Sequence, residues 1–293
     1  MIIKEPVLTD YNKFSSDQFN EVKYGLPSEV KFCKSCVESN QRPSTTIEYN
    51  HKRDSKKIAI ALDKNGVCSA CNFSNKKDSI DWTERDQMLR ELCNKHRRND
   101  GRYDCIVPGS GGKDSIYVSH LLKNEYGMHP LTVTWSPHMY TDWGRKNFDS
   151  WIHGGQDNML FTPNGKVHRL LTRLAVDLLF HPFQPFIFGQ KSLAPKIAST
   201  TGIQLIFYGE HEAEYGSGVE NNDESTQDSR FYSNISFEDT YLSGLPVNEL
   251  IKDFGIDKSE LQPYMPVDQN IVTDQKIEVR YFGYYKKWHP QGA

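Results

Sequence analysis

The chain has 293 residues, 37% hydrophobic and 25% charged, which is enough for one large α/β domain and a small accessory module but not for two full-size domains. Its formal net charge of −3 provides no general attraction to nucleic acid. No apolar run approaches the length of a membrane span and residues 1–31 contain no continuous apolar segment, so we expect a cytoplasmic protein that neither inserts into membranes nor binds nucleic acid.

Two cysteine pairs with the same spacing come first in the chain: Cys33, Cys36, Cys68 and Cys71. Each Cys-x-x-Cys turn offers two sulfur ligands, so the two turns together predict a tetrahedral structural Zn²⁺ site. Three alternatives to zinc are less favoured. Disulfides are disfavoured in a chain without an export signal, and a redox Cys-x-x-Cys motif would not need a second copy. The cysteines of an iron–sulfur cluster usually have less regular spacing. Residues 44–62 contain enough β-formers for the short strands of a zinc ribbon. We therefore assign residues 1–78 to a leader and a zinc-ribbon module.

Residues 79–98 begin with small and acidic side chains and then place apolar residues at helical spacing, which predicts a capped helix at the start of the main domain, residues 79–293.

The basic run at 95–102 could form a local nucleic-acid site, but a run of this kind is more often a solvated helix face. The two remaining cysteines lie outside the paired set: we expect Cys105 in the core and Cys93 in the core or on a helix surface.

The segment Ser110-Gly111-Gly112-Lys113-Asp114-Ser115 lies where a buried strand should become a helix. A short apolar run at 103–108 precedes it, and apolar residues at near-helical spacing follow it from Ile116. A glycine-rich turn between such elements directs free backbone N–H groups and the positive end of the helix to one place, which suits a phosphate chain.

The side chains of this segment support the same interpretation. The two glycines let the backbone approach an anion, the two serines add hydroxyl donors, Lys113 adds positive charge, and Asp114 could hold Mg²⁺. The alternative is an ordinary Gly-Gly turn whose Ser or Asp caps the following helix.

Beyond this loop the chain alternates between strands and helices. The patterns predict strands at 130–135, 158–162 and 204–208 and helices at 167–180 and 192–201. This order implies a doubly wound, mostly parallel sheet with ligands at the C-terminal edge of its strands. Glu210 and Glu214 follow the last of these strands, so the fold itself would place them beside a nucleotide; solvated loop acids are the alternative.

Three later segments have distinct compositions. Residues 215–229 are polar, which predicts a mobile lid or a disordered insertion, and 245–261 predict a small helical excursion. The tail at 279–291 is aromatic and cationic, so its side chains either stack on a base or sugar or pack in the core as a last strand.

All six positions of 110–115 match the Ser-Gly-Gly-x-Asp-Ser PP-loop, so the chain resembles the ATP pyrophosphatase superfamily, which includes GMP synthetase, asparagine synthetase and tRNA-thiolating enzymes. The resemblance implies that the loop holds the β,γ-pyrophosphate as leaving group while a substrate oxygen attacks the α-phosphorus. AMP then becomes the activating group, which a nitrogen or sulfur nucleophile displaces. Catalysis of this kind is mostly positioning and charge neutralisation.

The chain also contains four longer runs: Thr141-Asp142-Trp143-Gly144-Arg145-Lys146-Asn147, residues 181–191, the Gly209-Glu210-x-x-x-Glu214-Tyr215-Gly216 turn and the Tyr281-x-Gly283-Tyr284-Tyr285-x-Lys287-Trp288 tail. Together with the cysteine pairs they resemble the N-acetyl sugar amidotransferase family. That family converts an acetamido group of a nucleotide-linked or otherwise activated bacterial sugar into an acetamidino group, for lipopolysaccharide O-antigen, capsule or flagellar glycans. Two positions depart from the family pattern: His211 replaces an expected Asn, and His289 an expected Asp.

The resemblance implies a set of site residues, with ATP, Mg²⁺ and Zn²⁺ as cofactors. The expected catalytic residues are Lys113, Asp114, Glu210 and Glu214. The expected nucleotide-binding residues are Ser110, Gly111, Gly112, Lys113, Asp114, Ser115, Thr134, Trp135 and Gly209. No cysteine lies in a Gly-x-Cys-x-Gly nucleophile elbow, so a separate class I glutaminase subunit is implied as the source of ammonia. The sequence leaves open which sugar, carrier nucleotide and glutaminase are used.

Two other functions remain as alternatives. A tRNA thiolase can also combine a zinc ribbon with a PP-loop, but it needs catalytic cysteines near the nucleotide and a basic RNA surface, and no cysteine follows Cys105. A non-enzymatic binding module built on the zinc ribbon would leave the phosphate loop unexplained.

Overall fold

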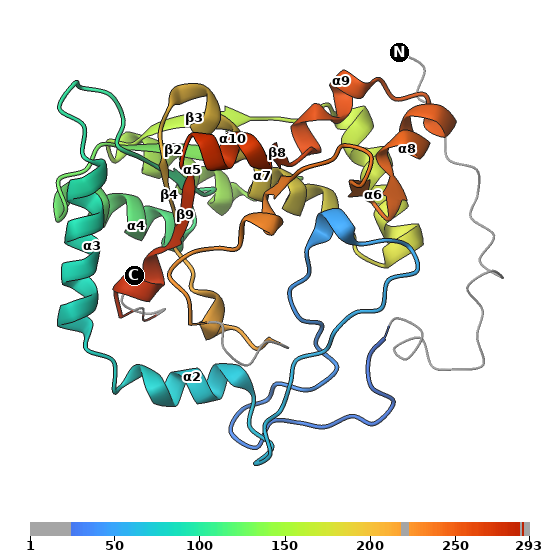
Figure 1. The fold of residues 1–293 in the computed structure, drawn as a ribbon, viewed down its shortest axis with the longest axis horizontal. Helices are drawn as coiled ribbons and strands as arrows, with labels where there is room; N and C mark the ends of the chain where they lie inside the picture. Colours follow the sequence, from blue (N-terminus) through green and yellow to red (C-terminus); the bar gives the residue numbers. More distant parts are fainter. Residues whose placement is uncertain (1–24, 218–222, 288, 290–293) are drawn as a thin grey trace.

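A computed structural model describes residues 25–217, 223–287 and 289. Its centre is a five-stranded parallel sheet in the order β3-β2-β1-β4-β9 (Figure 1). The strands are β1 (Cys105–Pro108), β2 (Pro130–Trp135), β3 (Asp157–Phe161), β4 (Leu205–Tyr208) and β9 (Glu278–Tyr281). The first four lie close to the positions that the sequence predicted, and the α/β fold with a parallel central sheet is confirmed.

Helices and short strand pairs surround this sheet. The α-helices of the described residues are α2 (Ser69–Lys77), α3 (Trp82–His96), α4 (Lys113–Asn124), α5 (Asp142–His153), α6 (Gly165–Leu179), α7 (Gln184–Thr201), α8 (Val247–Phe254), α9 (Lys258–Leu261), α10 (Gln269–Asp274) and α11 (Phe282–Tyr285). Two further pairs of strands lie outside the main sheet: β5 (Ser233–Asn234) with β8 (Val267–Asp268), and β6 (Tyr241–Leu242) with β7 (Leu245–Pro246).

Both faces of the sheet are buried at its three central strands β2, β1 and β4, as a doubly wound arrangement requires, whereas the edge strand β3 is mostly exposed. Successive side chains of a strand point to opposite faces. On β1, Ile106 packs into a core that includes α6 and α7, whereas Cys105 and Val107 pack into a second core with α3 and α4. This alternation places helices on each side of the sheet and leaves the C-terminal edge of its strands for the site.

Helix α7 begins earlier than the sequence indicated, at Gln184 instead of 192. Pro185 lies in its first turn, where a missing N–H is harmless, but Pro195 lies inside the helix, where proline is normally unfavourable. Phe188 and neighbouring residues of this helix are buried in the core. Tertiary packing therefore offsets a helix preference that is locally weak.

Residues 44–62 do not form the short strands expected of a zinc ribbon. Within the described chain this segment contains the short helix η2 (Glu48–Asn50) and isolated bridges. Tyr49 of η2 is 2% exposed and stacks on Phe188 of α7, with the ring centroids 4.9 Å apart. This segment packs against α7, where the aromatic pair and its buried area stabilise it.

The aromatic residues of the predicted tail 279–291 pack in the core up to Tyr285, which was one of the two alternatives, whereas residues 288, 290 and 291 lie outside the described chain. Strand β9 continues directly into α11, and Tyr281, Phe282 and Tyr285 are all buried. The predicted helical excursion is confirmed as α8 and α9.

In the polar segment 215–229, for which a mobile lid or a disordered insertion was predicted, residues 225–227 pair along β9. Residues 218–222 lie outside the described chain. Thr226 bridges to Arg280, and Gln227, which is 2% exposed, donates its N–H to the carbonyl of Val279 at 2.9 Å. None of the described helices combines the length and apolar character needed to cross a membrane.

Candidate functional site

The candidate site lies where the strand order reverses. From β1 the chain proceeds to β2 and β3 on one side and later returns to β4 on the other, so the ends of β1 and β4 form a topological switch point. A cavity of about 240 Å³, here called the switch-point cavity, opens between the loops after these strands and helix α7. The residues predicted from sequence that line it are Ser110, Gly112, Asp114, Ser115, Trp135, Gly209 and Glu210.

The loop after β1 turns directly into α4, whose N-cap is Gly112. Gly111 has a φ of +82°, and a Cβ added there would lie 2.6 Å from the Cα of Phe148, so both the conformation and the available space require glycine. The first N–H groups of a helix have no partners within it, and the helix dipole adds partial positive charge. This end of the switch-point cavity is therefore suited to an anion such as phosphate.

Three carboxylates lie near the side chain of Tyr215. Burial raises the pKa of Tyr215, and the negative charges of Glu210, Asp114 and Glu214 raise it further. Asp114 also forms an ion pair with Lys113. Carboxylate oxygens beside an anion-binding helix end fit Mg²⁺, which proteins usually hold with one or two carboxylates together with substrate phosphates.

Two predicted residues are engaged in other contacts. Thr134 is fully buried and does not line the switch-point cavity, and its Oγ1 accepts a hydrogen bond from Asn158 on the neighbouring strand at 3.0 Å. Ser115 lines the cavity, but its Oγ donates to the carbonyl of Gly112 at 3.0 Å. The Ser115 hydroxyl therefore stabilises the loop in this structure.

Helix α7 forms a wall of the switch-point cavity to which the sequence analysis assigned no role. This wall consists of Phe186, Gly189, Gln190, Lys191 and Leu193. A Cβ added at Gly189 would lie 2.0 Å from Cδ2 of Trp135, so only glycine allows the indole to pack this closely. The buried Nε1 of Trp135 has no hydrogen-bond partner among the described residues. Most of the wall lies within residues 181–191, one of the runs that carry the family resemblance. The resemblance therefore included this segment but did not predict that it lines the cavity.

The four paired cysteines meet in space. Their Sγ atoms all lie within 4.8 Å of one another, with Cys33 to Cys71 at 3.9 Å and Cys36 to Cys68 at 3.8 Å. A tetrahedral site with Zn–S bonds of about 2.3 Å has sulfur–sulfur edges of about 3.8 Å. Burial would raise the pKa of Cys33, but backbone N–H groups, first that of Cys68, lower it to about 6. The cluster could therefore form a zinc site.

The cysteine cluster is linked to the loop that follows β4. Cys68 is the N-cap of α2, and Ser69 begins this helix. The N–H of Ser217 donates to Ser69 Oγ at 3.0 Å, and Lys77 at the end of α2 forms an ion pair with Glu214. Glu214 is thus paired with α2 and does not line the switch-point cavity, although it follows Glu210 closely in the chain.

His211, one of the two departures from the family pattern, supports this same loop. It is 1% exposed, and its ring contacts Phe73 of α2 with the centroids 5.3 Å apart. Its Nε2 donates to the carbonyl of Glu224 at 3.2 Å. Burial lowers the pKa of His211 to about 4, although the charge of Asp223 opposes this. The imidazole is therefore neutral near pH 7 and connects the loop to α2 and to 223–224.

Comparisons with known proteins give limited similarity. No protein-family model matches the chain. The uncharacterized protein MJ1599 of Methanocaldococcus jannaschii is 30% identical over 83 residues, and the chain spans only 29% of the length of this curated relative and 28% of its own. The solved structure of NH3-dependent NAD synthetase from Campylobacter jejuni, in complex with the nitrate ion, is 12% identical and covers 62% of this chain and 77% of its own, with a TM-score of 0.36. A similarity this low transfers neither fold nor activity.

The cysteine geometry predicts about one zinc ion per chain in protein purified under reducing conditions. Cys68→Ser should lose most of the zinc and lower the unfolding midpoint, because a tetrahedral site that loses a thiolate binds metal much more weakly. Cys93→Ser, which changes a buried cysteine outside the cluster, should retain the metal. Elemental analysis and thiol titration measure both outcomes, and metal-free wild-type protein with four accessible thiols would contradict the assignment.

The geometry of the loop 110–115 predicts different responses at its two adjacent glycines. Gly111→Ala should lower the free energy of unfolding by about 1–3 kcal/mol, because it forces a side chain into a left-handed conformation against the backbone of α5. Gly112→Ala should stay within about 0.5 kcal/mol of wild type, because no atom lies within 4 Å of its added Cβ and its φ is −75°. Urea denaturation compares the two, and equal effects would show that the loop is not constrained as described.

Proposed function

We propose that this protein is an ATP-dependent amidotransferase that converts the N-acetyl group of an activated bacterial sugar into an acetamidino group and releases AMP and pyrophosphate. The pathway would be the biosynthesis of a surface polysaccharide such as O-antigen, capsule or a flagellar glycan. The switch-point cavity carries the proposal, because it joins a glycine loop and a helix N-terminus to the carboxylates of Asp114 and Glu210. These are the groups needed to hold a nucleoside triphosphate and its Mg²⁺ ion.

The chain's own residues would act mainly by positioning. The N–H groups at the start of α4 and the ammonium of Lys113 would neutralise the pyrophosphate as it leaves, while Asp114 and Glu210 would hold Mg²⁺. An amide oxygen is a weak nucleophile, and its carbon is a weak electrophile until that oxygen carries AMP. Ammonia can then add to the carbon, and AMP leaves with the oxygen, so that the product is an amidine.

The arrangement of the cysteines supports amide transfer over thiolation. Four of the six cysteines form the cluster, and the other two, Cys93 and Cys105, are fully buried in the core beneath the sheet. Burial holds the pKa of Cys105 well above its usual value, so it is not a thiolate at neutral pH. No cysteine lines the switch-point cavity. A thiolase would need a reactive sulfur at this position.

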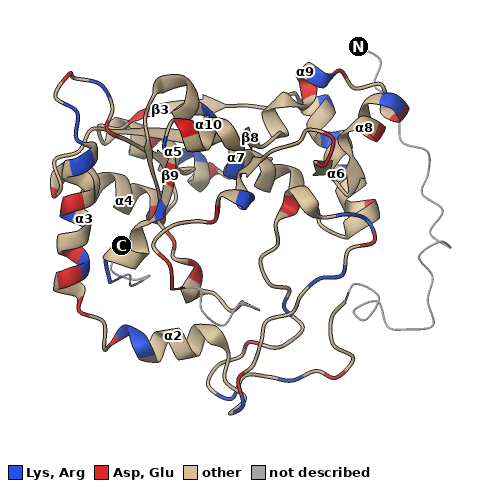
Figure 2. Ribbon diagram, in the orientation of Figure 1, with Lys and Arg blue, Asp and Glu red and all other residues tan. Residues whose placement is uncertain are grey.

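The basic run at 95–102 is largely neutralised within the protein. Lys95 and His96 contact Glu278, and Arg98 and Arg102 both contact Asp100. Basic and acidic residues also alternate along α3 (Figure 2). Such pairing weakens any attraction of this run for a polyanion, which favours a small-molecule acceptor over RNA.

The first functional prediction concerns the products of ATP cleavage. With a suitable N-acetylated sugar and ammonium, wild-type protein should form AMP and pyrophosphate, and Asp114→Asn or Lys113→Ala should reduce the rate by about 100-fold or more, because each removes a charge that acts on the phosphates. Asp253→Asn, a matched change on the exposed surface of α8, should retain full activity. Phosphorus NMR identifies the products, and formation of ADP with phosphate would refute the proposed reaction.

The second functional prediction concerns nitrogen supply. Because no cysteine of the chain is placed as a glutaminase nucleophile, we propose that a separate class I glutaminase delivers ammonia. The purified chain should form amidine with ammonium alone, and with glutamine only after a glutaminase partner is added. Mass spectrometry detects the replacement of oxygen by NH in the product. Robust glutamine-dependent activity of the single chain would contradict this division of labour.

A further inference from the structure

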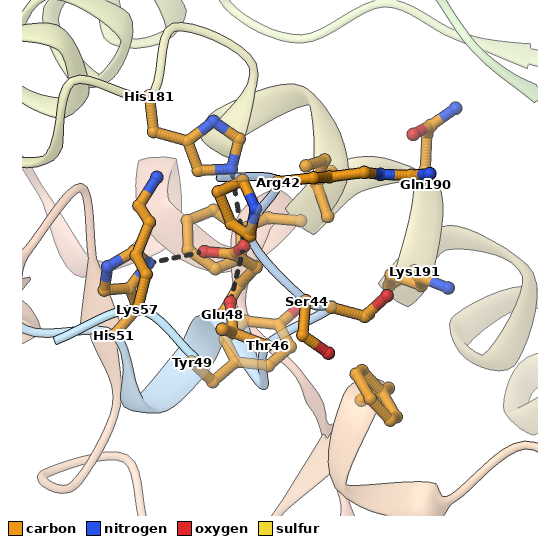
Figure 3. Close-up of a pocket in the computed structure, with 15 residues that line it drawn as sticks. Arg42, Ser44, Thr46, Glu48, Tyr49, His51, Lys57, His181, Gln190 and Lys191 are labelled. Carbon is orange, nitrogen blue, oxygen red and sulfur yellow. Dashed lines mark hydrogen bonds and ion pairs between the residues drawn. The ribbon is translucent and has the colours of Figure 1, made fainter. Parts of the chain in front are cut away.

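A second cavity of about 430 Å³, drawn in Figure 3, shares lining residues with the switch-point cavity. One side is formed by residues between Arg42 and Lys57 of the N-terminal module, and the other by α7 with His181 and Phe231. Gln190 and Lys191 of α7 line both cavities. The two cavities therefore adjoin each other at these two residues.

A buried carboxylate holds the two sides of the second cavity together. Glu48 accepts hydrogen bonds from Gln184 Nε2 at 2.7 Å, His51 Nδ1 at 3.1 Å and His181 Nε2 at 3.3 Å, as Figure 3 shows for the two histidines. Thr46 Oγ1 donates to the same carboxylate at 3.0 Å. Burial alone would raise the pKa of Glu48, but these partners hold it well below its usual range. Glu48 is thus a saturated anion that positions the wall.

Positive charge dominates the rest of the lining. Lys57 is half-buried and has no ion pair among the described residues, and Arg42 has one with the half-buried Glu38. Lys191 also lacks an ion pair in the described chain, and its ammonium lies 5.3 Å from the ring of Tyr208 and 5.7 Å from that of Phe231. Burial of such a charge is unfavourable unless something compensates it. An anionic ligand would supply that compensation.

Polar and aromatic groups complete the second cavity. Three successive hydroxyl residues line it, Ser44, Thr45 and Thr46, together with the amide of Gln190 and the rings of Tyr49, Phe188 and Phe231. Hydroxyl and amide groups recognise sugar hydroxyls by hydrogen bonds, and ring faces pack against the apolar faces of sugar rings. The lining thus matches a ligand that has hydroxyl groups and negative charge.

We infer that the second cavity binds the acceptor, a phosphate-linked N-acetylated sugar, and presents its acetamido oxygen to the switch-point cavity past Lys191. This inference rests on the proposed function. In the reaction the amide oxygen bonds to the α-phosphorus of ATP, and the bond from that phosphorus to the pyrophosphate oxygen breaks. Lys191 lies at the boundary between the two cavities, where its charge would stabilise the oxygens of the transferred phosphoryl group.

This assignment gives the N-terminal module a role in substrate binding. Its residues between Arg42 and Lys57 form one wall of the second cavity. The cysteine cluster joins the parts of the chain that come before and after this segment. The module would then be needed for acceptor affinity as well as for stability.

The test uses UDP-N-acetylglucosamine as the probe, with the full chain and titration calorimetry. Binding should be weakened at least tenfold in Lys57→Ala and in Lys191→Ala, whereas Lys64→Ala, an exposed lysine of the same module that lines neither cavity, should bind as wild type. Lys57→Ala should leave the affinity for a non-hydrolysable ATP analogue unchanged, since it changes only the second cavity. The unfolding midpoint of each variant verifies that the protein is folded.

Two further measurements separate the second cavity from its neighbour. Wild-type protein saturated with the ATP analogue should still bind the probe, because the two occupy different cavities, and free N-acetylglucosamine should bind at least tenfold more weakly than the probe. Absence of probe binding, its displacement by the ATP analogue, or equal affinity of the free sugar would overturn the inference. Formation of AMP from ATP together with normal probe binding by Lys57→Ala would overturn only the inference about the second cavity. Formation of ADP would refute the proposed function, even if the probe binds in the second cavity.

Discussion

The pairing of β1 with β4 determines where this protein can bind a ligand. The two strands lie side by side, with Cys105 opposite Leu205 and Ile106 opposite Ile206. After β1 the chain continues to β2 on one side of this pair, and after β4 it continues to β9 on the other side. No crossover connection covers the space between their ends. The loops after them approach closely, since a Cβ added at Gly209 would lie 3.2 Å from the Asp114 carbonyl oxygen. The helix end, the carboxylates and the wall from α7 all depend on this adjacency.

A second constraint is the burial of Glu48. A carboxylate away from water is strongly unfavourable unless several donors satisfy it, and here the donors are His51 directly after η2, His181, and Gln184 at the start of α7. The same bonds therefore determine how the N-terminal segment meets the main domain. Because α7 also contacts Trp135, this one anion connects the geometry of both cavities.

The cysteine cluster acts on the site through α2. The cluster determines where this helix starts, and Lys77 at its other end pairs with Glu214 in the loop after β4. His211 adds an apolar contact between the same loop and the same helix. The position of the loop that carries Glu210 is thus coupled to the N-terminal module, although no cysteine reaches the switch-point cavity.

The sequence by itself determined the features that depend on local chemistry. The strand before the phosphate loop, the glycines of the loop and the cysteine spacing are all readable from neighbouring residues, because turn conformation, helix starts and metal-ligand spacing are local properties. Only the tertiary structure decided which distant groups meet: Glu48 with His181, Glu214 with Lys77, and α7 with both cavities. These contacts arise from buried charge and core packing between residues far apart in the chain, more than a hundred residues for the two ion pairs, and no local pattern predicts them.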